Sequence, residues 1–217
     1  IVLTVFVGVF SIVQLSKVND LSSDIADNWM PSTRALLEMK SSMSRFRQQE
    51  VQFSTSINQD DMAFYEKGLT EGLERWKKNR ADYEKLITLP EEKAVYQDYA
   101  KNMDLYGLEH KKIAAAVRSQ REGTDALMRG ESQRLFREMM TLIDKMVTLN
   151  VAGSEAASDM ADKVHRDGRN LIIGILVICV LAAVALALSI ARIVSKPLSE
   201  AVRVAQAVAG GDLNSRI

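Results

Sequence analysis

The sequence is poor in cysteine, proline and aromatic residues, and its charges cancel. Its one cysteine, Cys179, cannot form an intrachain disulfide, and a lone thiolate does not make a metal site. The net charge is zero, from 28 basic and 28 acidic residues, which excludes a general electrostatic attraction to nucleic acid. Only three prolines interrupt 217 residues, so long helices are possible. We therefore expect neither a disulfide-stabilised fold nor a nucleic-acid-binding protein.

Motifs that carry catalysis are also missing from the sequence. It contains no paired nucleophile and base, no metal-ligand spacing and no glycine-rich phosphate loop. Methionines that recur at helical spacing, such as Met39, Met43 and Met103, are interpreted as core residues, because a thioether fills irregular gaps well. We expect a protein that is not an enzyme and that binds no cofactor or metal.

The abundant residues favour long helices, two of them partly in a membrane. Ala, Leu, Met, Glu, Lys and Arg dominate the composition. Residues 171–191 contain no charge, and about 20 apolar residues cross the ~30 Å hydrocarbon core as a helix. Residues 1–13 are also apolar but too short to span. They lack the basic start and small-residue cleavage site of a signal peptide, the alternative interpretation, so we assign residues 1–14 to a truncated first transmembrane helix.

Basic residues indicate how the second apolar segment is oriented. Arg192, Lys196 and Arg203 follow it within the distance over which positive charge keeps a segment in the cytoplasm. Arg166 and Arg169 on the other side weaken this signal. We predict that the region between the two apolar segments lies outside the cell membrane and that residues after 192 lie inside.

Four helical patterns fill the region between the apolar segments. Apolar residues recur every three or four positions over about 25–57, 62–87, 96–117 and 135–160. Asn58, Pro90 and Gly123 mark the turns between them as a helix start, a first helical residue and a helix-ending glycine. Such spacing on four helices with short connections predicts an all-α fold. We expect an antiparallel up-down-up-down four-helix bundle flanked by two transmembrane helices.

Two short segments resemble known signalling proteins. Pro197-Leu198 just after the second span, Glu200 three residues beyond the proline and the closing Gly211-Asp212-Leu213 resemble the start of a HAMP domain. The segment Asn28-Trp29-Met30-Pro31-Ser32, and the turn before a long fourth helix, resemble the ligand-binding domain of bacterial methyl-accepting chemotaxis proteins.

These resemblances imply a homodimeric receptor of the bacterial inner membrane with its sensor domain in the periplasm. Such a receptor binds small molecules near its membrane-distal tip and transmits the signal by a small displacement of the second span. The resulting division is residues 1–14 as first transmembrane helix, 15–170 as periplasmic ligand-binding bundle, 171–191 as second transmembrane helix and 192–217 as the start of HAMP. A cytoplasmic signalling domain is expected after residue 217.

The resemblance carries only part of the ligand recognition of the family. In its aspartate- and serine-sensing members, arginines of the first helix bind the ligand carboxylate. With Trp29 aligned to the corresponding tryptophan, these positions fall on Leu36, Ser41 and Arg45, of which only Arg45 is basic. An amino acid is therefore the second choice of ligand.

An antiparallel arrangement brings several polar residues to one height of the bundle. Glu50, Glu66 and His110 occupy seam positions that should be apolar, and buried charge is costly unless it is paired. The layer is either a satisfied structural network or a pocket for a polar ligand. Arginine matches a carboxylate by paired hydrogen bonds, so we predict a small organic acid as ligand. The predicted ligand-binding residues are Arg45, Arg47, Glu50, His110, Arg134 and Arg137.

Three functions fit these patterns. The first is the input module of a chemoreceptor. The second is the sensor region of a HAMP-linked histidine kinase, and the third is a structural membrane protein without a ligand. A long heptad hairpin after residue 217 would favour the first, whereas a helix with a phosphorylatable histidine followed by an ATP-binding domain would favour the second.

Overall fold

The structure is a computed structural model that describes residues 2–119 and 123–210. Its elements are α1 (Val2–Asp24), η1 (Ile25–Trp29), α2 (Met30–Ser54), α3 (Gln59–Glu84), α4 (Pro90–Arg118), α5 (Thr124–Arg129), α6 (Glu131–Ile190), η2 (Ala191–Ser195) and α7 (Lys196–Ala209), where η marks a π-helical turn. Contacts divide the chain into two compact units, Lys17–Asp162 and the described parts of 1–16 and 163–217.

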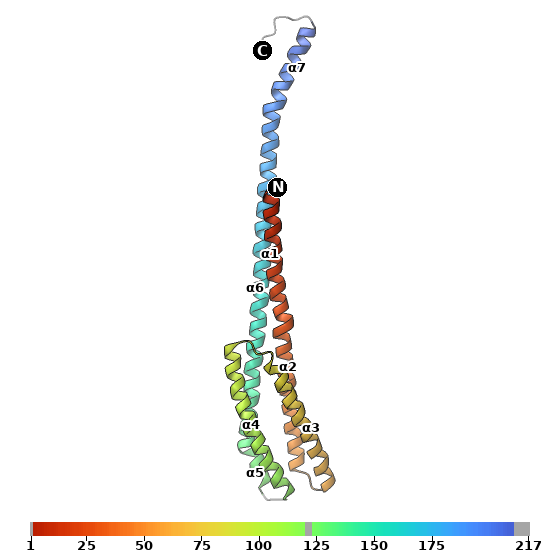
Figure 1. Ribbon diagram of the computed structural model, residues 1–217, viewed down its shortest axis with the longest axis vertical. Helices are drawn as coiled ribbons and strands as arrows, with labels where there is room; N and C mark the ends of the chain where they lie inside the picture. Colours follow the sequence, from red (N-terminus) through yellow and green to blue (C-terminus); the bar gives the residue numbers. More distant parts are fainter. Residues whose placement is uncertain (1, 120–122, 211–217) are drawn as a thin grey trace. The chain divides into compact units, whose positions relative to one another are not determined.

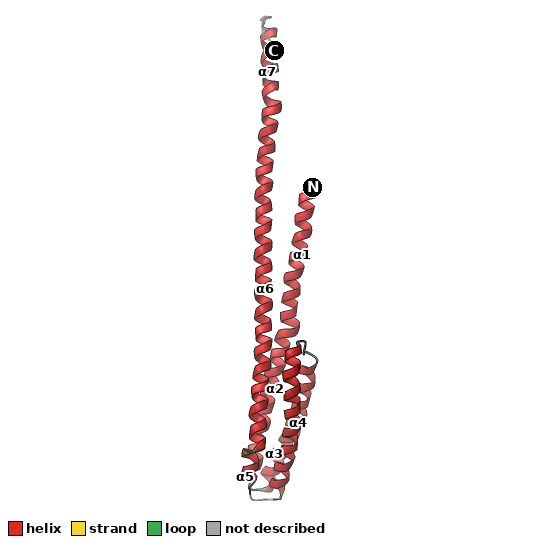
Figure 2. Cartoon of the chain, turned by 90° about the vertical axis from the view of Figure 1, so that its left-hand side faces the viewer, coloured by secondary structure: helices red, strands yellow, loops and turns green. Residues whose placement is uncertain are grey.

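The unit of residues 17–162 is an antiparallel four-helix bundle made by α2, α3, α4 and, as the fourth helix, α5 with the first half of α6 (Figures 1 and 2). One end, here called the distal end, contains the α2–α3 turn and α5. The other, the proximal end, contains the α3–α4 turn, and the chain enters and leaves the bundle there. The prediction of an all-α, up-down-up-down four-helix bundle is confirmed.

The core of the bundle follows the predicted apolar seams. Phe46, Trp76, Tyr106 and Leu135, one from each helix, are at most 2% exposed. The ring centroid of Trp76 lies 5.7 Å from that of Phe46 and 5.9 Å from that of Tyr106. Complete burial of one large apolar side chain contributes roughly 1.5–3 kcal/mol. This aromatic seam therefore fixes the spacing of α2, α3 and α4.

The predicted turns are present. The Asn58 side chain accepts a hydrogen bond of 2.8 Å from the backbone N–H of Asp61, which satisfies one free donor at the start of α3. Pro90 is the first residue of α4, where its missing N–H costs nothing. Gly123 has φ +88°, a conformation that glycine adopts without strain.

Three details of the helix assignment were wrong. Helix α2 ends at Ser54, and Ile57, expected in its apolar seam, is 92% exposed in the turn. The fourth helix is not continuous, because α5 ends at Arg129, Gly130 interrupts the helix, and α6 begins at Glu131. Further along α6, Met160 is 50% exposed rather than part of the core.

Two prolines inside the long helices are each preceded by a π-helical turn. Residues 25–29 form such a turn two residues before Pro31, and residues 191–195 form one two residues before Pro197. Proline lacks an N–H and its ring pushes against the preceding helical turn. A wider turn accommodates both defects, so each helix passes its proline without ending.

The second unit contains the start of α1, the end of α6, η2 and α7. Two helices of the chain, around residues 4–54 and 124–203, include segments long and apolar enough to cross a membrane. A Cβ atom at Gly168 of α6 would lie 3.6 Å from Cβ of Gln14 of α1, so these two helices meet closely. Of the HAMP-like residues, Pro197 and Leu198 lie in α7, whereas Gly211, Asp212 and Leu213 lie outside the described residues. The domain boundaries stay a prediction.

Candidate functional site

A buried carboxylate, Glu50, lies at the centre of a polar cluster in the distal half of the bundle. Its side chain is completely buried. Oε2 accepts hydrogen bonds from Arg47 Nη1 at 2.7 Å and from the Tyr106 hydroxyl at 2.5 Å. Oε1 lies 2.7 Å from Nδ1 of His110, which donates because an ionised carboxylate only accepts. We call Arg47, Glu50, Tyr106, His110 and Ser132 the Glu50 network.

Arg47 connects this network to the interruption between α5 and α6. Its Nη1 donates to the Ser132 hydroxyl at 2.6 Å, and its Nη2 donates to the Met128 carbonyl at 2.6 Å and to the Gln133 side chain at 3.0 Å. Helix α5 stops after Arg129, so its last carbonyls need hydrogen-bond donors from outside the helix. The Arg47 guanidinium supplies a donor and thereby ties α2 to the break.

The cluster keeps its charged forms despite burial. Burial by itself raises the pKa of Glu50, but the hydrogen bonds from His110, Tyr106 and Arg47 outweigh it, and the pKa lies below its ordinary value. Burial likewise lowers the pKa of Arg47, but its interactions with Tyr106 and with the Glu50 carboxylate more than compensate, so this pKa is raised. Glu50 and Arg47 therefore form a buried ion pair.

Three of the six predicted ligand-binding residues, Arg47, Glu50 and His110, thus meet in space. They form hydrogen bonds with one another and with neighbouring groups. Of the two alternatives that the sequence allowed, a structural network or a ligand pocket, this arrangement matches the structural network. Glu66, expected in the same layer, pairs with Arg118 instead. Glu66 and Arg118 border a small cavity of about 120 Å³ that also touches His110.

The other three predicted residues lie apart from the Glu50 network. Arg134 is exposed and pairs with Glu131 at 2.6 Å and Glu138 at 2.5 Å on its own helix. Arg137 is exposed on α6. Arg45 is exposed on α2, and its side chain has no hydrogen bond or ion pair among the described residues. As a group, the six residues remain an untested prediction.

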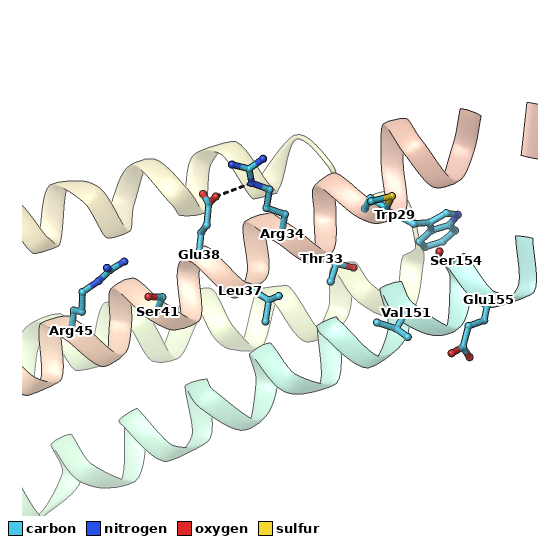
Figure 3. A pocket seen from close by; sticks show the side chains of 11 residues that line it. Trp29, Thr33, Arg34, Leu37, Glu38, Ser41, Arg45, Val151, Ser154 and Glu155 are labelled. Atoms are coloured by element: carbon cyan, nitrogen blue, oxygen red, sulfur yellow. Dashed lines mark hydrogen bonds and ion pairs between the residues drawn. The ribbon is translucent and has the colours of Figure 1, made fainter. Parts of the chain in front are cut away.

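Arg45 borders a groove between α2 and α6, shown in Figure 3. The groove has a volume of about 560 Å³. Leu37 and Val151 form part of its apolar surface and are 50% and 40% exposed. Hydroxyl groups and charged side chains stand among them, and Arg34 and Glu38 form an ion pair of 3.1 Å at one rim. The lining residues are Trp29, Met30, Thr33, Arg34, Leu37, Glu38, Ser41, Arg45, Val151, Ser154 and Glu155.

Comparisons with known proteins identify the family. Residues 1–165 match the family model of the four-helix-bundle sensory module for signal transduction. The chain belongs to this family. Among solved structures, the module is similar to a periplasmic sensor domain of a sensor histidine kinase, with 15% sequence identity and a TM-score of 0.55 over 65% of this chain and 94% of that one. At this identity the likeness concerns the fold. No curated protein matches the sequence significantly.

The sensory module contains a second buried carboxylate that sequence reasoning missed. Glu92 is 1% exposed near the proximal end. Its Oε1 accepts from the Tyr83 hydroxyl at 2.6 Å and from the Asn150 amide, so it joins α3, α4 and α6. Burial and the neighbouring Glu92 raise the pKa of Tyr83, which therefore stays protonated as a donor. Among the residues that the structure describes, Oε2 of Glu92 and the Ser32 hydroxyl have no hydrogen-bond partner.

Part of each network has a signal in the sequence. Glu92 lies in the first turn of α4, where an acid also stabilises the helix start. Its spacing of four residues to Tyr96 and seven to Tyr99 nevertheless places it on the buried seam. For Arg47 no such spacing signal exists. It adjoins the seam residue Phe46, and only the length of its side chain brings the guanidinium to Ser132.

Proposed function

We propose that this sensory module is the input part of a bacterial transmembrane chemoreceptor. It lies in the periplasm, is anchored in the inner membrane by helices at residues 1–14 and 171–191, and binds a small organic acid. The acid binds in the groove between α2 and α6, and the signal reaches a HAMP domain that begins at residue 192. Family membership supports the sensory role, and the two apolar helices support the anchoring.

The guanidinium of Arg45, which is unbonded among the described residues, is the observation that supports a carboxylate as ligand. Of the predicted arginines, Arg47 is occupied by five side chains and one carbonyl, and Arg134 by two acids. Arg45 keeps all its donors for a carboxylate beside the hydroxyl of Ser41. A charge-assisted hydrogen bond contributes roughly 1.5–3 kcal/mol. Contact with Leu37 and Val151 would then add apolar burial for the carbon part of the acid.

A second copy of the chain would complete the groove. Met30, Leu37 and Val151 leave an apolar surface on the open side of α2 and α6, at 63%, 50% and 40% exposure. Clustered apolar groups of this kind are typical of protein interfaces, and most oligomers of soluble domains are symmetric dimers. In a homodimer this face would be covered, and Arg45 would lie at the interface, where exclusion of water strengthens its attraction for an anion.

The continuity of α6 supports the relay. Val151 and Ser154 border the groove, and the same helix continues to Ile190 in the second apolar segment. A ligand that shifts α6 at the groove by an Å or two along its axis would shift its far end by the same amount, because an α-helix resists compression through its hydrogen bonds. The basic residues Arg169 and Arg192 would change depth at the membrane surfaces.

The alternative output is a histidine kinase, since the similar solved domain comes from a sensor kinase. An amino acid is the alternative ligand, because Glu38 or Glu155 at the groove could accept its ammonium group. The sequence expected after residue 217 would distinguish a chemoreceptor from a histidine kinase. Binding measurements decide between the ligands.

Titration calorimetry of the whole chain in lipid nanodiscs tests the ligand proposal. A panel of mono-, di- and tricarboxylates and amino acids is titrated. We expect a carboxylate to bind, and Arg45→Ala to weaken it at least about tenfold, the loss of roughly one charge-assisted hydrogen bond. Arg134→Ala is the matched control and leaves the affinity unchanged. Binding confined to neutral or cationic compounds, or unchanged carboxylate affinity in Arg45→Ala, would contradict the proposal.

A further inference from the structure

Gly107 occupies a position in the middle of α4 that the packing of the chain does not explain. Glycine weakens a helix interior relative to alanine, so a reason for it is expected. In other bundle helices the reason is visible, because a Cβ atom at Gly68 would lie 2.9 Å from Gln49 and one at Gly153 would lie 2.5 Å from Trp29. A Cβ atom at Gly107 meets no atom within 4 Å. The space in front of it is open.

That open space belongs to a groove between α3 and α4 with a volume of about 420 Å³. This volume falls in the range of small-molecule sites, roughly 300–1,000 Å³. Its apolar lining includes Leu73 of α3 and Leu108 of α4, together with the buried rings of Trp76 and Tyr106. Such walls suit a flat apolar body.

The polar residues of this groove are mainly basic. Lys77, Arg80 and Lys111 line it, against one acid, Asp104. The Arg80 side chain is 28% exposed and incompletely bonded. Its Nε donates to the Tyr96 hydroxyl at 3.0 Å, its Nη1 lies 3.7 Å from Asp104, and no hydrogen bond from Nη2 occurs within the described ranges. A partly buried guanidinium with an unused donor is a suitable partner for a carboxylate.

From these observations we propose that the α3–α4 groove is a second small-molecule site that binds an aromatic carboxylate. The carboxylate pairs with Arg80, and the ring lies over Gly107 between Leu73 and Leu108. The site is separate from the α2–α6 groove and does not depend on Arg45. Its occupant also touches His110, which lines this groove and bonds to Glu50. Binding there therefore acts on the network that joins α2 and α4 to the α5–α6 break.

The two tryptophans of the chain allow the two grooves to be observed separately. Trp76 lines the α3–α4 groove and Trp29 lines the α2–α6 groove. The whole chain in nanodiscs is labelled with 5-fluorotryptophan, the two ¹⁹F signals are assigned with Trp29→Phe, and 1-naphthoate is titrated. We expect a saturable shift of the Trp76 signal. The neutral probe 1-naphthalenemethanol should bind at least about tenfold more weakly, because it lacks the charge that pairs with Arg80.

Variants determine whether the probe occupies the proposed site. A Cβ atom at Gly107 meets no neighbour, so Gly107→Leu extends a side chain into the groove and should abolish the Trp76 shift while circular dichroism and thermal unfolding stay native. Arg80→Gln should weaken naphthoate at least about tenfold, whereas Arg75→Gln, an exposed residue of the same helix outside the groove, should not. Arg45→Ala should leave the Trp76 response intact. A response of Trp29 alone, lost in Arg45→Ala, or native binding in Gly107→Leu, would overturn the proposal.

Discussion

Glu50 is the side chain on which the distal core depends most. It is wholly buried, and three donors from α2 and α4 use its two oxygens. A buried ion pair of this kind seldom adds much net stability compared with an apolar pair, but removing one partner leaves the other charged and unsolvated. The Glu50 network therefore acts mainly as a determinant of geometry, holding the α5–α6 break against α2.

The free energy of unfolding should fall as the pH drops below about 4.5, partly because of Glu50. Its pKa in the folded protein lies below the ordinary value of 4.5, so the unfolded chain takes up the proton first. The stability that Glu50 contributes is complete above 4.5 and is lost as the pH falls through its folded-state pKa, at about 1.4 kcal/mol for each unit of difference. Urea unfolding measured from pH 7 to pH 3 checks this. Glu50→Gln should give a flatter acid limb; an unchanged acid limb would show that Glu50 does not titrate as described.

Arg47→Met should destabilise the bundle by about 3–5 kcal/mol, because it leaves Glu50 charged and buried without its cationic partner. Combining it with Glu50→Gln should restore part of this loss, since the uncompensated charge disappears. Exposed Arg134→Ala should leave stability unchanged. Denaturant unfolding of the unaltered protein and of these three variants measures the changes in the free energy of unfolding. Equal losses for Arg47→Met and the double variant would mean that Arg47 acts through packing rather than charge.

At the scale of the helices, the fold could be predicted from the sequence, whereas the interruption of the fourth helix was not predicted. Seam residues such as Trp76 and Tyr99 and the turns at Asn58 and Pro90 follow from local chemistry, so they could be predicted. The break at Gly130 was missed, although glycine weakens a helix interior. The bonds that Arg47 of α2 makes beside this break could not be predicted, because they join residues far apart in the sequence. The Glu50 cluster was predicted as a polar layer. The polar groups of this cluster are hydrogen-bonded by hydroxyl and carbonyl partners, such as Ser132. No sequence pattern distinguishes these partners from other residues.

Two glycines in helix interiors should respond oppositely to alanine. Gly153→Ala places a Cβ atom where it would lie 2.5 Å from the Trp29 ring, so it should destabilise the bundle by about 1–3 kcal/mol through forced separation of η1 and α6. Gly107→Ala meets no neighbour and should stabilise by roughly 0.5–1 kcal/mol. Thermal unfolding compares the two. Stabilisation by both would show that Trp29 does not pack closely on α6.

At the scale of the whole molecule, the account requires that two copies meet through the α2–α6 face. In a chain whose native cysteine is replaced, Cys179→Ala, the added variant Leu37→Cys should give disulfide-linked dimers in membranes under mild oxidation. Phe64→Cys is the matched control, since Phe64 is also exposed, at 72%, but lies on α3. More dimer through position 64 than through position 37 would place the interface elsewhere.

The central claim is that a carboxylate at Arg45 moves α6, and one cross-link tests it. A Cβ atom at Gly168 would lie 3.6 Å from that of Gln14, within the range for a disulfide, so Gln14→Cys/Gly168→Cys with Cys179→Ala should cross-link readily. The measurement is the rate of disulfide formation in membranes with and without a carboxylate that calorimetry has shown to bind. We predict that the carboxylate changes this rate severalfold and that adding Arg45→Ala removes the change. Identical rates with the groove empty and saturated would contradict the account.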